Sequence, residues 1–533
     1  MSNVTGAIND LNNTINNFEA NVDVHVNEIR QSSINVDQAA SKIYDKILEF
    51  REEMEHGEQK QLAHENIIRI DQIIKEQFSN YETIRRTVMG VVRDFDINLV
   101  RNSTIQELSE ELWLTSSRYW LSYALIAITA WVNDYPDVAR NALAESGRKD
   151  AIKTTLFFCL LNLRFNRMEA AKKWFYEYFK TLDPTMLQQE TAVMLQAFLN
   201  GIFGKDKELE YEVIDVIDQW ISIINEDAEI CEELVNAYEQ YIANTNPQVT
   251  FNYEGIKQFC ANSQELIKSY NDVSKYQVLL NVLGELEVEA GEQNDDNYAE
   301  RVDAVLIDLI SNYDEEEKDL RNQQEYFNLV VRNEGEIEKA EAQYEAEMAL
   351  QNEHFNIGKQ MIKWAIYDDS DTTDVTVRKF GFQNTKTWFK GALEKWTMKV
   401  QQEFPIEYSL NIDTWSGVSN GNDQEELTEN MKKYYETNKF QNMFVNTINI
   451  AALIALIVSA GLAFVTLYAL VITVAAAVLL VFRCVKAAKD YPKRVSNALA
   501  ALSQTLAEIA DFRQYFEENI EKKDEVLSAA EFI

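Results

Sequence analysis

Apolar residues near the start of the chain recur at alternating intervals of three and four positions. This spacing is typical of a coiled coil, in which the apolar side chains form a seam facing a partner helix. The phase shifts after Ile29, the pattern stops near Gly57, and it resumes from Ile67 to Phe95. We therefore expect residues 1–100 to form a coiled-coil hairpin of two long antiparallel helices that turn near Gly57. The seam residues before this turn are Val4, Ile8, Leu11, Ile15, Phe18, Val22, Ile29, Val36, Ala40, Ile43, Ile47, Phe50 and Met54.

Two later stretches also have a helical pattern. Residues 298–367 predict one long charged helix, and its part from Glu334 to Glu353 has few apolar positions and is expected to face solvent. Residues 493–533 predict an amphipathic helix, because their apolar positions return every three or four residues. These apolar positions are Val495, Leu499, Leu502, Leu506, Ile509, Phe512 and Phe516.

Residues 368–425 are the least helical part of the chain. A loop rich in Asp covers residues 368–374, and the stretch from Val375 to Phe382 predicts a short strand. A second extended piece is expected from Ile406 to Trp415, because Gly417 and Gly421 follow it closely. The all-α prediction therefore allows minor β structure within residues 375–416.

Residues 101–290 predict a block of packed helices that ends at the polar, turn-rich stretch 291–297. Within it, residues 120–184 resemble tetratricopeptide-type repeats, which implies an α-solenoid-like arrangement and a protein partner. Two departures from that family are clear: its Leu-Gly pair is absent, and the second helix pair follows after about 32 residues where the family has 34. The resemblance rests on Trp131, Tyr135, Pro136, Ala139, Ala142 and Leu143, then on Leu163, Arg167, Met168, Ala171, Trp174, Phe175 and Pro184.

One apolar run dominates the C-terminal part of the chain. From Phe440 to Phe482 there is no Asp, Glu, Lys or Arg, although 26% of all residues are charged. One helix of this length would measure about 65 Å, whereas a bilayer core of about 30 Å requires only about 20 residues. We therefore predict a transmembrane hairpin over residues 440–483, with its fold-back at Ser459–Gly461. The alternative is a long helix buried in a soluble core.

Small residues recur every four positions in both arms of this predicted hairpin. Such stripes allow two helices to approach closely in lipid. The predicted hairpin residues are Ile448, Ala451, Ala455, Ser459, Gly461, Ala469, Thr473, Ala477 and Phe482.

Basic residues flank the apolar run on both sides. Basic residues near membrane segments are retained on the cytoplasmic side, so both flanks are expected there, and the turn is expected to point outward. These residues are Lys432, Lys433, Lys439, Arg483, Lys486, Lys489, Lys493 and Arg494.

The bulk composition supports long helices and excludes one class of partner. The chain has 533 residues but only 5 Pro and 16 Gly, the two residue types that weaken or break helices. A net charge of −37 argues against binding to nucleic acid, because the phosphate backbone would be repelled. The 4 cysteines are far apart without a CxxC pair, so free thiols are expected rather than a zinc site or disulfides.

Candidate chemistry is sparse. The 4 histidines form no ligand spacing, and Gly201 to Lys205 lacks the spacing and the Ser or Thr of a phosphate-binding loop. Asp369, Asp371 and Asp374 carry calcium-type ligands, but the glycine and the closing Glu of an EF-hand loop are missing. We therefore predict no enzyme, no catalytic residue, no cofactor and no metal.

Two functions remain open. The first is a membrane-anchored helical scaffold or sensor with its body in the cytosol, which binds a lipid bilayer and either a protein partner or further copies of itself through coiled coils. The second is an α-helical pore-forming protein, similar in plan to toxin-like or effector proteins of that class, whose hairpin is stored in a soluble form and then inserted.

Overall fold

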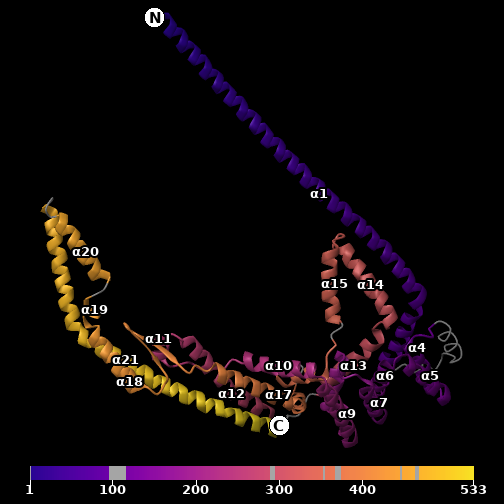
Figure 1. Ribbon diagram of the computed structural model, residues 1–533. Helices are drawn as coiled ribbons and strands as arrows, with labels where there is room; N and C mark the ends of the chain where they lie inside the picture. The colour runs from indigo at the N-terminus through magenta and orange to yellow at the C-terminus, as the bar shows by residue number, and fades with distance from the viewer. Residues whose placement is uncertain are drawn as a thin grey trace. The chain divides into compact units, whose positions relative to one another are not determined.

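The computed structural model describes residues 2–94, 116–287, 295–351, 354–366, 374–444, 447–462 and 467–533 (Figure 1). Within these ranges the chain is almost entirely helical, with a single two-stranded sheet, and the all-α prediction is confirmed. The chain divides into two compact units. The first unit contains residues 1–182, 188–190 and 300–354, and the second contains residues 183–187, 191–299 and 355–533.

The first unit is built on one long helix and two groups of shorter helices. The helices are α1 (Ser2–Asp94), α4 (Trp120–Val132), α5 (Pro136–Lys149), α6 (Ala151–Arg164), α7 (Met168–Thr181), most of α13 (Asp295–Ser311), α14 (Glu315–Arg332) and α15 (Ile337–Gln351). One group runs from α4 to α7 and the other from α13 to α15. Helix α4 of the first group and helix α14 of the second pack on the second half of α1.

The turn predicted near Gly57 is wrong, because α1 continues through this residue without interruption. One Gly in a helix costs only about 1 kcal/mol relative to Ala, and its polar neighbours form the exposed surface of a helix rather than a loop. The second half of the α1 seam packs instead on residues far away in the sequence, chiefly on α14. Its buried apolar residues are Ala63, Ile70, Ile74, Phe78, Tyr81, Ile84, Val88, Val91 and Val92.

The turn between α14 and α15 touches the backbone of α1 directly. Gly335 has a φ of 91°, which L side chains rarely adopt, and a Cβ at this position would lie 2.0 Å from the carbonyl oxygen of His56. Only Gly permits both the backbone angle and the close approach. The predicted single helix over 298–367 is therefore wrong: α13, α14, α15 and α16 (Ile357–Ile366) share this range.

A buried ion pair joins α1 to α14. Arg85 Nη1 donates to Glu317 Oε2 at 2.7 Å, and Arg85 Nη2 donates to Glu317 Oε1 at 3.2 Å. Arg85 is 7% exposed and Glu317 is 1% exposed. The guanidinium group also lies 5.1 Å from the ring centroid of Tyr313. Two buried charges are tolerated here because each satisfies the other in bidentate geometry.

The second unit packs its helices around α17 and α21. Its first elements are α8 (Gln189–Leu199), α9 (Lys207–Glu226), α10 (Ala228–Asn244), α11 (Glu254–Phe259) and α12 (Ser263–Glu287). The first two residues of α8 belong to the first unit. After α16 follow α17 (Val375–Glu403), β1 (Tyr408–Ile412), β2 (Trp415–Ser419), α18 (Gln424–Thr437), α19 (Lys439–Phe444), α20 (Thr447–Leu462) and α21 (Leu467–Phe532).

The strand predicted from Val375 to Phe382 is wrong, because these residues begin α17. The side chain of Asp374 accepts a hydrogen bond from the backbone N–H of Val377 at 2.9 Å and caps the helix. This cap outweighs the strand preference of the β-branched residues that follow it. The second extended piece is confirmed: β1 pairs with β2 in antiparallel register from Tyr408–Ser419 to Ile412–Trp415.

The amphipathic helix predicted over 493–533 is confirmed, but it is part of the longer helix α21. Leu502, Leu506, Ile509 and Phe512 are buried in a core that also contains residues of α11, α12, β1 and α18. Towards its N-terminus α21 continues through Pro492 into the apolar run. One helix therefore carries both the core seam and one arm of the predicted hairpin.

Arg85→Ala is expected to lower the free energy of unfolding by about 3 kcal/mol, because it removes the bidentate partner of the buried Glu317 carboxylate. Only the longer hydrogen bond from Arg321 Nη2, at 3.3 Å, then remains. Urea denaturation followed by circular dichroism measures this change. The control is Arg86→Ala, which removes the neighbouring exposed arginine and is expected to have little effect. Equal losses of stability in the two variants would contradict the role of the buried pair.

Candidate functional site

Helices α20 and α21 pack against each other as an antiparallel hairpin (Figure 1). Near the start of α20, the side chain of Asn449 accepts a hydrogen bond from Arg483 Nε of α21 at 3.0 Å. The sequence predicts the fold-back near Ser459–Gly461, but these residues are still helical, and α20 ends one residue later at Leu462. A glycine near a helix C-terminus does not by itself end the helix.

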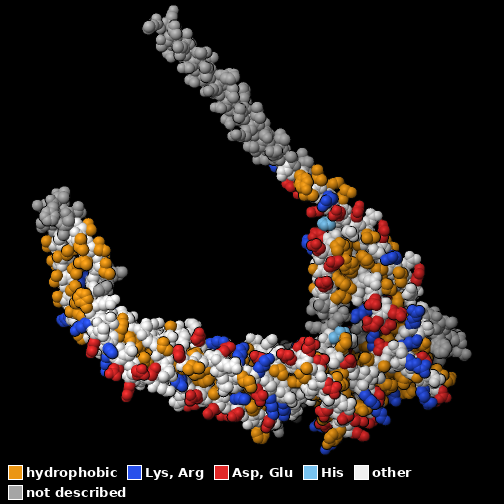
Figure 2. Space-filling view, in the orientation of Figure 1, with side chains coloured by type: hydrophobic (Ala, Val, Ile, Leu, Met, Phe, Trp, Pro, Cys, Tyr) orange, Lys and Arg blue, Asp and Glu red, His pale blue; other side chains and the backbone are white. Residues whose placement is uncertain are grey.

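The outer sides of this hairpin are covered with exposed aliphatic side chains (Figure 2). On α20 they follow one helical face, with exposed fractions from 45% at Ile450 to 62% at Ile457. On α21 they range from 50% at Leu479 to 68% at Phe482. We call this set the apolar surface: Ile450, Leu453, Ile454, Ile457, Val458, Val474, Val478, Leu479, Val481, Phe482 and Val485.

The predicted small-residue stripes agree with the structure in one arm. Thr473 and Ala477 are half-buried beside the exposed Val474 and Val478, as expected for residues on the inner side of the hairpin. In the other arm Ala451 is exposed, so its predicted place between the helices is wrong. The less exposed positions of α20 are Asn449, Ala452 and Leu456. The surroundings of Ile448, Ala455, Ser459, Gly461 and Ala469 lie outside the described residues.

The predicted basic residues lie at the base of the hairpin and divide into two groups. The lysines are exposed on α18, α19 and α21: Lys432, Lys433, Lys439, Lys486, Lys489 and Lys493. The two arginines, Arg483 and Arg494, are half-buried and bind groups of the protein itself. Only the lysines are therefore fully available to an external partner.

Arg494 fastens α21 to the β-hairpin. Its Nε donates to Asp413 Oδ2 at 2.6 Å, its Nη2 donates to Asp413 Oδ1 at 2.8 Å, and its Nη1 donates to the carbonyl oxygen of Asn442 at 2.8 Å. The hydroxyl group of Tyr435 donates to Asp413 Oδ2 at 2.9 Å. Partial burial alone would raise the pKa of Asp413, but the hydrogen bonds from Arg494 and Tyr435 outweigh it and hold the pKa below its ordinary value.

Sequence reasoning missed three residues at the base of the hairpin: Asn449, Asp413 and Tyr435. For Asn449 a signal exists, because it is the only Asn or Gln between Thr447 and Phe482 and an amide in an apolar run requires a partner. Asp413 occupies the turn of the β-hairpin with a φ of 56°, a conformation that Asp tolerates better than most residues. Its pairing with a residue 81 positions later has no local signal.

The other candidate chemistry stays sparse in the structure. Asp374 caps α17, whereas Asp369 and Asp371 lie outside the described residues. In the described part of the chain, no group of three or more His, Cys, Asp or Glu side chains is placed to hold a metal ion. The four cysteines are free thiols, and burial raises the pKa of the Cys159 thiol, which disfavours a reactive thiolate.

No family model, curated protein or solved structure matches this chain. Among the residues that the structure describes, no helix is both long enough and apolar enough to span a membrane. The membrane-spanning hairpin predicted over residues 440–483 is therefore not supported by the helices that the structure describes.

Arg494→Gln is expected to loosen the base of the hairpin, because it removes the bidentate pair with Asp413 and the hydrogen bond to Asn442. Faster backbone hydrogen exchange in α19 and in the β1–β2 turn, measured by mass spectrometry, checks this expectation. The control Lys493→Gln removes the adjacent exposed charge and should leave exchange unchanged.

The pH dependence of the same contact follows from the lowered pKa of Asp413. A carboxylate with a lowered pKa stabilises the folded state above its ordinary value, 3.8, and loses this contribution as the pH falls through the lowered value. Acid should therefore lower the protection factors of the β1–β2 turn, which correct the exchange rates for the slower intrinsic exchange at low pH, more in the natural protein than in Arg494→Gln. An identical acid response in both proteins would contradict the proposed role of the pair.

Proposed function

We propose that this chain is a non-enzymatic, membrane-associated helical scaffold or sensor that anchors to a lipid bilayer through the α20–α21 hairpin. The observation that carries this proposal is the apolar surface, in which apolar side chains on two adjacent helices are 45–68% exposed to solvent. Soluble proteins rarely expose contiguous apolar patches of large size, and such patches mark binding sites for proteins or membranes.

The energetics favour lipid as the partner of this surface. Full burial of one Val, Leu, Ile or Phe side chain contributes about 1.5–3 kcal/mol, and the apolar surface contains eleven such residues on two helices. Away from its ends, each helix satisfies its own backbone hydrogen bonds, so most of the hairpin can enter hydrocarbon without exposing unpaired amides. The exposed lysines at the base would then lie beside anionic headgroups.

The length of α20 sets the depth of the proposed insertion. Its 16 residues correspond to about 24 Å, whereas a bilayer core measures about 30 Å. The proposal is therefore a hairpin embedded from one side. Because basic residues occupy both flanks, we assign both flanks and the rest of the chain to the cytoplasmic side.

The alternative is a pore-forming protein whose hairpin is stored within the fold before insertion. A stored hairpin would keep its aliphatic side chains covered by other parts of the protein. The exposure of the apolar surface in this structure favours the anchor over the stored form. A pore-former also predicts leakage of the target membrane, which the anchor does not.

Val478→Asp combined with Val481→Asp is expected to weaken binding to lipid vesicles about 100-fold or more, because each charge costs about 2.5–3.5 kcal/mol near the centre of a membrane helix. Flotation of the purified protein with phosphatidylcholine–phosphatidylserine vesicles measures this. The control is Ile406→Asp, which alters a residue that is 82% exposed but distant from the hairpin in sequence.

Equal flotation of the natural protein, the Val478→Asp, Val481→Asp variant and the Ile406→Asp control would contradict the proposal. Release of an entrapped dye from the same vesicles separates the two functions. Binding without release supports the anchor, and release that depends on Val478 and Val481 supports the pore-former.

We also propose self-assembly through α1. The seam residues before Gly57 that the structure describes are exposed: Ile47 at 59%, Phe50 at 61% and Met54 at 52%. In the same helix the seam after Gly57 is buried against α14 and its neighbours. The exposed part of the seam has the heptad spacing that a second copy of α1 would match.

The helix pairs α4–α5 and α6–α7 remain a proposed tetratricopeptide-like block.

Phe50→Glu is expected to shift the chain towards a smaller assembly, because it places an unpaired charge on the proposed seam. Sedimentation velocity at several protein concentrations reports the assembly state. The control Glu52→Gln changes a residue away from the seam and should leave sedimentation unchanged. A natural protein that sediments as a monomer at every concentration would contradict self-assembly.

A further inference from the structure

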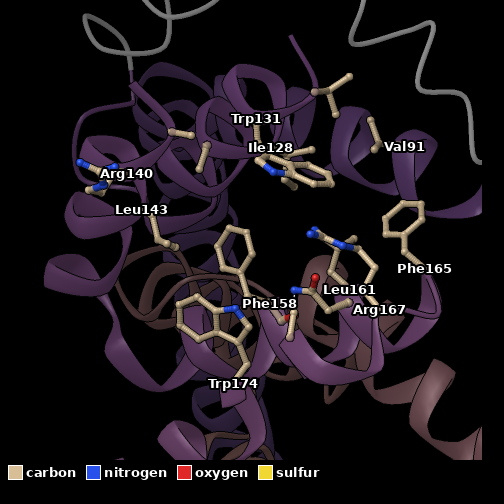
Figure 3. A pocket seen from close by; sticks show the side chains of 15 residues that line it. Val91, Ile128, Trp131, Arg140, Leu143, Phe158, Leu161, Phe165, Arg167 and Trp174 are labelled. Atoms are coloured by element: carbon tan, nitrogen blue, oxygen red, sulfur yellow. Dashed lines mark hydrogen bonds between the residues drawn. The ribbon is translucent and has the colours of Figure 1, made fainter. Parts of the chain in front are cut away.

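The first unit contains a cavity of about 560 Å³ between the helix pair α4–α5 and the helix pair α6–α7 (Figure 3). Cavities that bind small molecules usually measure about 300–1,000 Å³ and are mostly apolar with few polar groups. This cavity fits both criteria, since its walls are aliphatic and aromatic apart from two arginines and one asparagine. It is far from the hairpin in sequence and belongs to the other unit.

Aromatic rings form much of the cavity wall. Phe158 of α6 stacks on Trp174 of α7, with ring centroids 5.4 Å apart. Trp131 lies at the end of α4 on the opposite side of the opening, and 53% of its surface is exposed (Figure 3). Ile128 and Leu161 are buried and complete the apolar lining. An apolar molecule in this cavity would therefore contact both aromatic faces and aliphatic side chains.

Arg167 gives the cavity a fixed positive charge. Its guanidinium carbon lies 4.3 Å from the ring centroid of Trp131, so the side chain is held over the aromatic face. The backbone N–H of Arg167 donates to the carbonyl oxygen of Asn162 at 2.8 Å, which fixes the loop between α6 and α7. Figure 3 shows the Arg167 side chain extending into the opening beneath Trp131. Within the described part of the chain, no carboxylate forms an ion pair with Arg167.

The second arginine of the cavity is a weaker candidate for binding a ligand. Arg140 of α5 lies beyond Leu143 at another side of the cavity (Figure 3). Both arginines are exposed, but Arg140 already lies 3.5 Å from the carboxylate of Asp137. The charge that faces the aromatic wall is therefore that of Arg167.

We propose that this cavity binds an organic carboxylate with an apolar body. The apolar body occupies the space between Phe158, Trp174 and Ile128, and the carboxylate accepts two hydrogen bonds from the Arg167 guanidinium. The planar guanidinium matches carboxylate geometry, and its stacking on Trp131 limits the entropy lost on binding. The apolar body can be either an aliphatic chain or a fused aromatic ring, so one carboxylate of each kind is tested.

Isothermal titration of the full chain with dodecanoate, below its micelle concentration, and with 2-naphthoate tests the proposal. We expect saturable binding of at least one of these carboxylates with a stoichiometry of one per chain. The uncharged analogues dodecanol and 2-naphthol are expected to bind about tenfold or more weakly, because a hydrogen-bonded charge contributes about 1.5–3 kcal/mol. Absence of saturable binding of both carboxylates would overturn the proposal.

Two variants and one control locate the site. Arg167→Gln should weaken carboxylate binding about tenfold or more and leave binding of the uncharged analogue unchanged. Ala170→Trp fills the cavity and should abolish binding of both, with an unchanged circular dichroism spectrum as evidence of folding. Arg148→Gln, an exposed arginine of α5 outside the cavity, should bind like the natural protein. Carboxylate binding that is unaffected by Arg167→Gln would overturn the proposal whether or not the filled variant folds.

The apolar surface of the hairpin also attracts amphipathic molecules, so the two sites have to be separated. The Val478→Asp, Val481→Asp variant is expected to keep the stoichiometric carboxylate binding that depends on Arg167. Loss of this binding in the hairpin variant, together with its retention in Arg167→Gln, would place the ligand on the hairpin and overturn the proposal. If the hairpin does not bind vesicles, the expected carboxylate binding in the cavity is unchanged, because the cavity and the hairpin belong to different units.

Discussion

The helical continuity of α21 is the constraint on which the C-terminal half of the chain depends. Its C-terminal part is buried in the core of the second unit through residues such as Leu502, Ile509 and Phe512. Its N-terminal part carries Val478, Val481 and Phe482 on an exposed face. Because a helix fixes the angle between successive residues at about 100°, the packing of the core also fixes which side chains of the hairpin point outward.

A few polar contacts at the base connect this hairpin to the body. Asn449 and Arg483 join α20 to α21, and Asp413 with Arg494 joins α21 to the β-hairpin. These contacts lie where the exposed face changes from aliphatic side chains to lysines. A hairpin held only by apolar packing would lose its orientation if the same side chains transferred to lipid, whereas a polar base keeps its geometry in either environment.

The helices and the apolar run were predictable from the sequence because they depend on local periodicity. Their partners were not. The turn expected at Gly57 failed because a glycine permits a turn but does not require one, and the real partner of the α1 seam, α14, lies more than 200 residues further along the chain. The strand expected at Val375 failed because a single capping residue, Asp374, decides the helix start. The pair of Asp413 and Arg494 and the stacking of Arg167 on Trp131 depend on tertiary packing, for which one sequence gives no signal.

Pro492 has a mechanical consequence for the long helix that carries the hairpin. Proline has no backbone N–H, so the carbonyl group of Ala488, one turn earlier, receives no helical hydrogen bond from it, and the ring crowds that turn. The turn from Ala488 to Pro492, which lies among the exposed lysines of α21 and directly before the Arg494 contact, is therefore the least stiff part of this helix. A lateral load on the hairpin would be absorbed at this joint before it reached the core, so the body could tilt against a surface without unfolding.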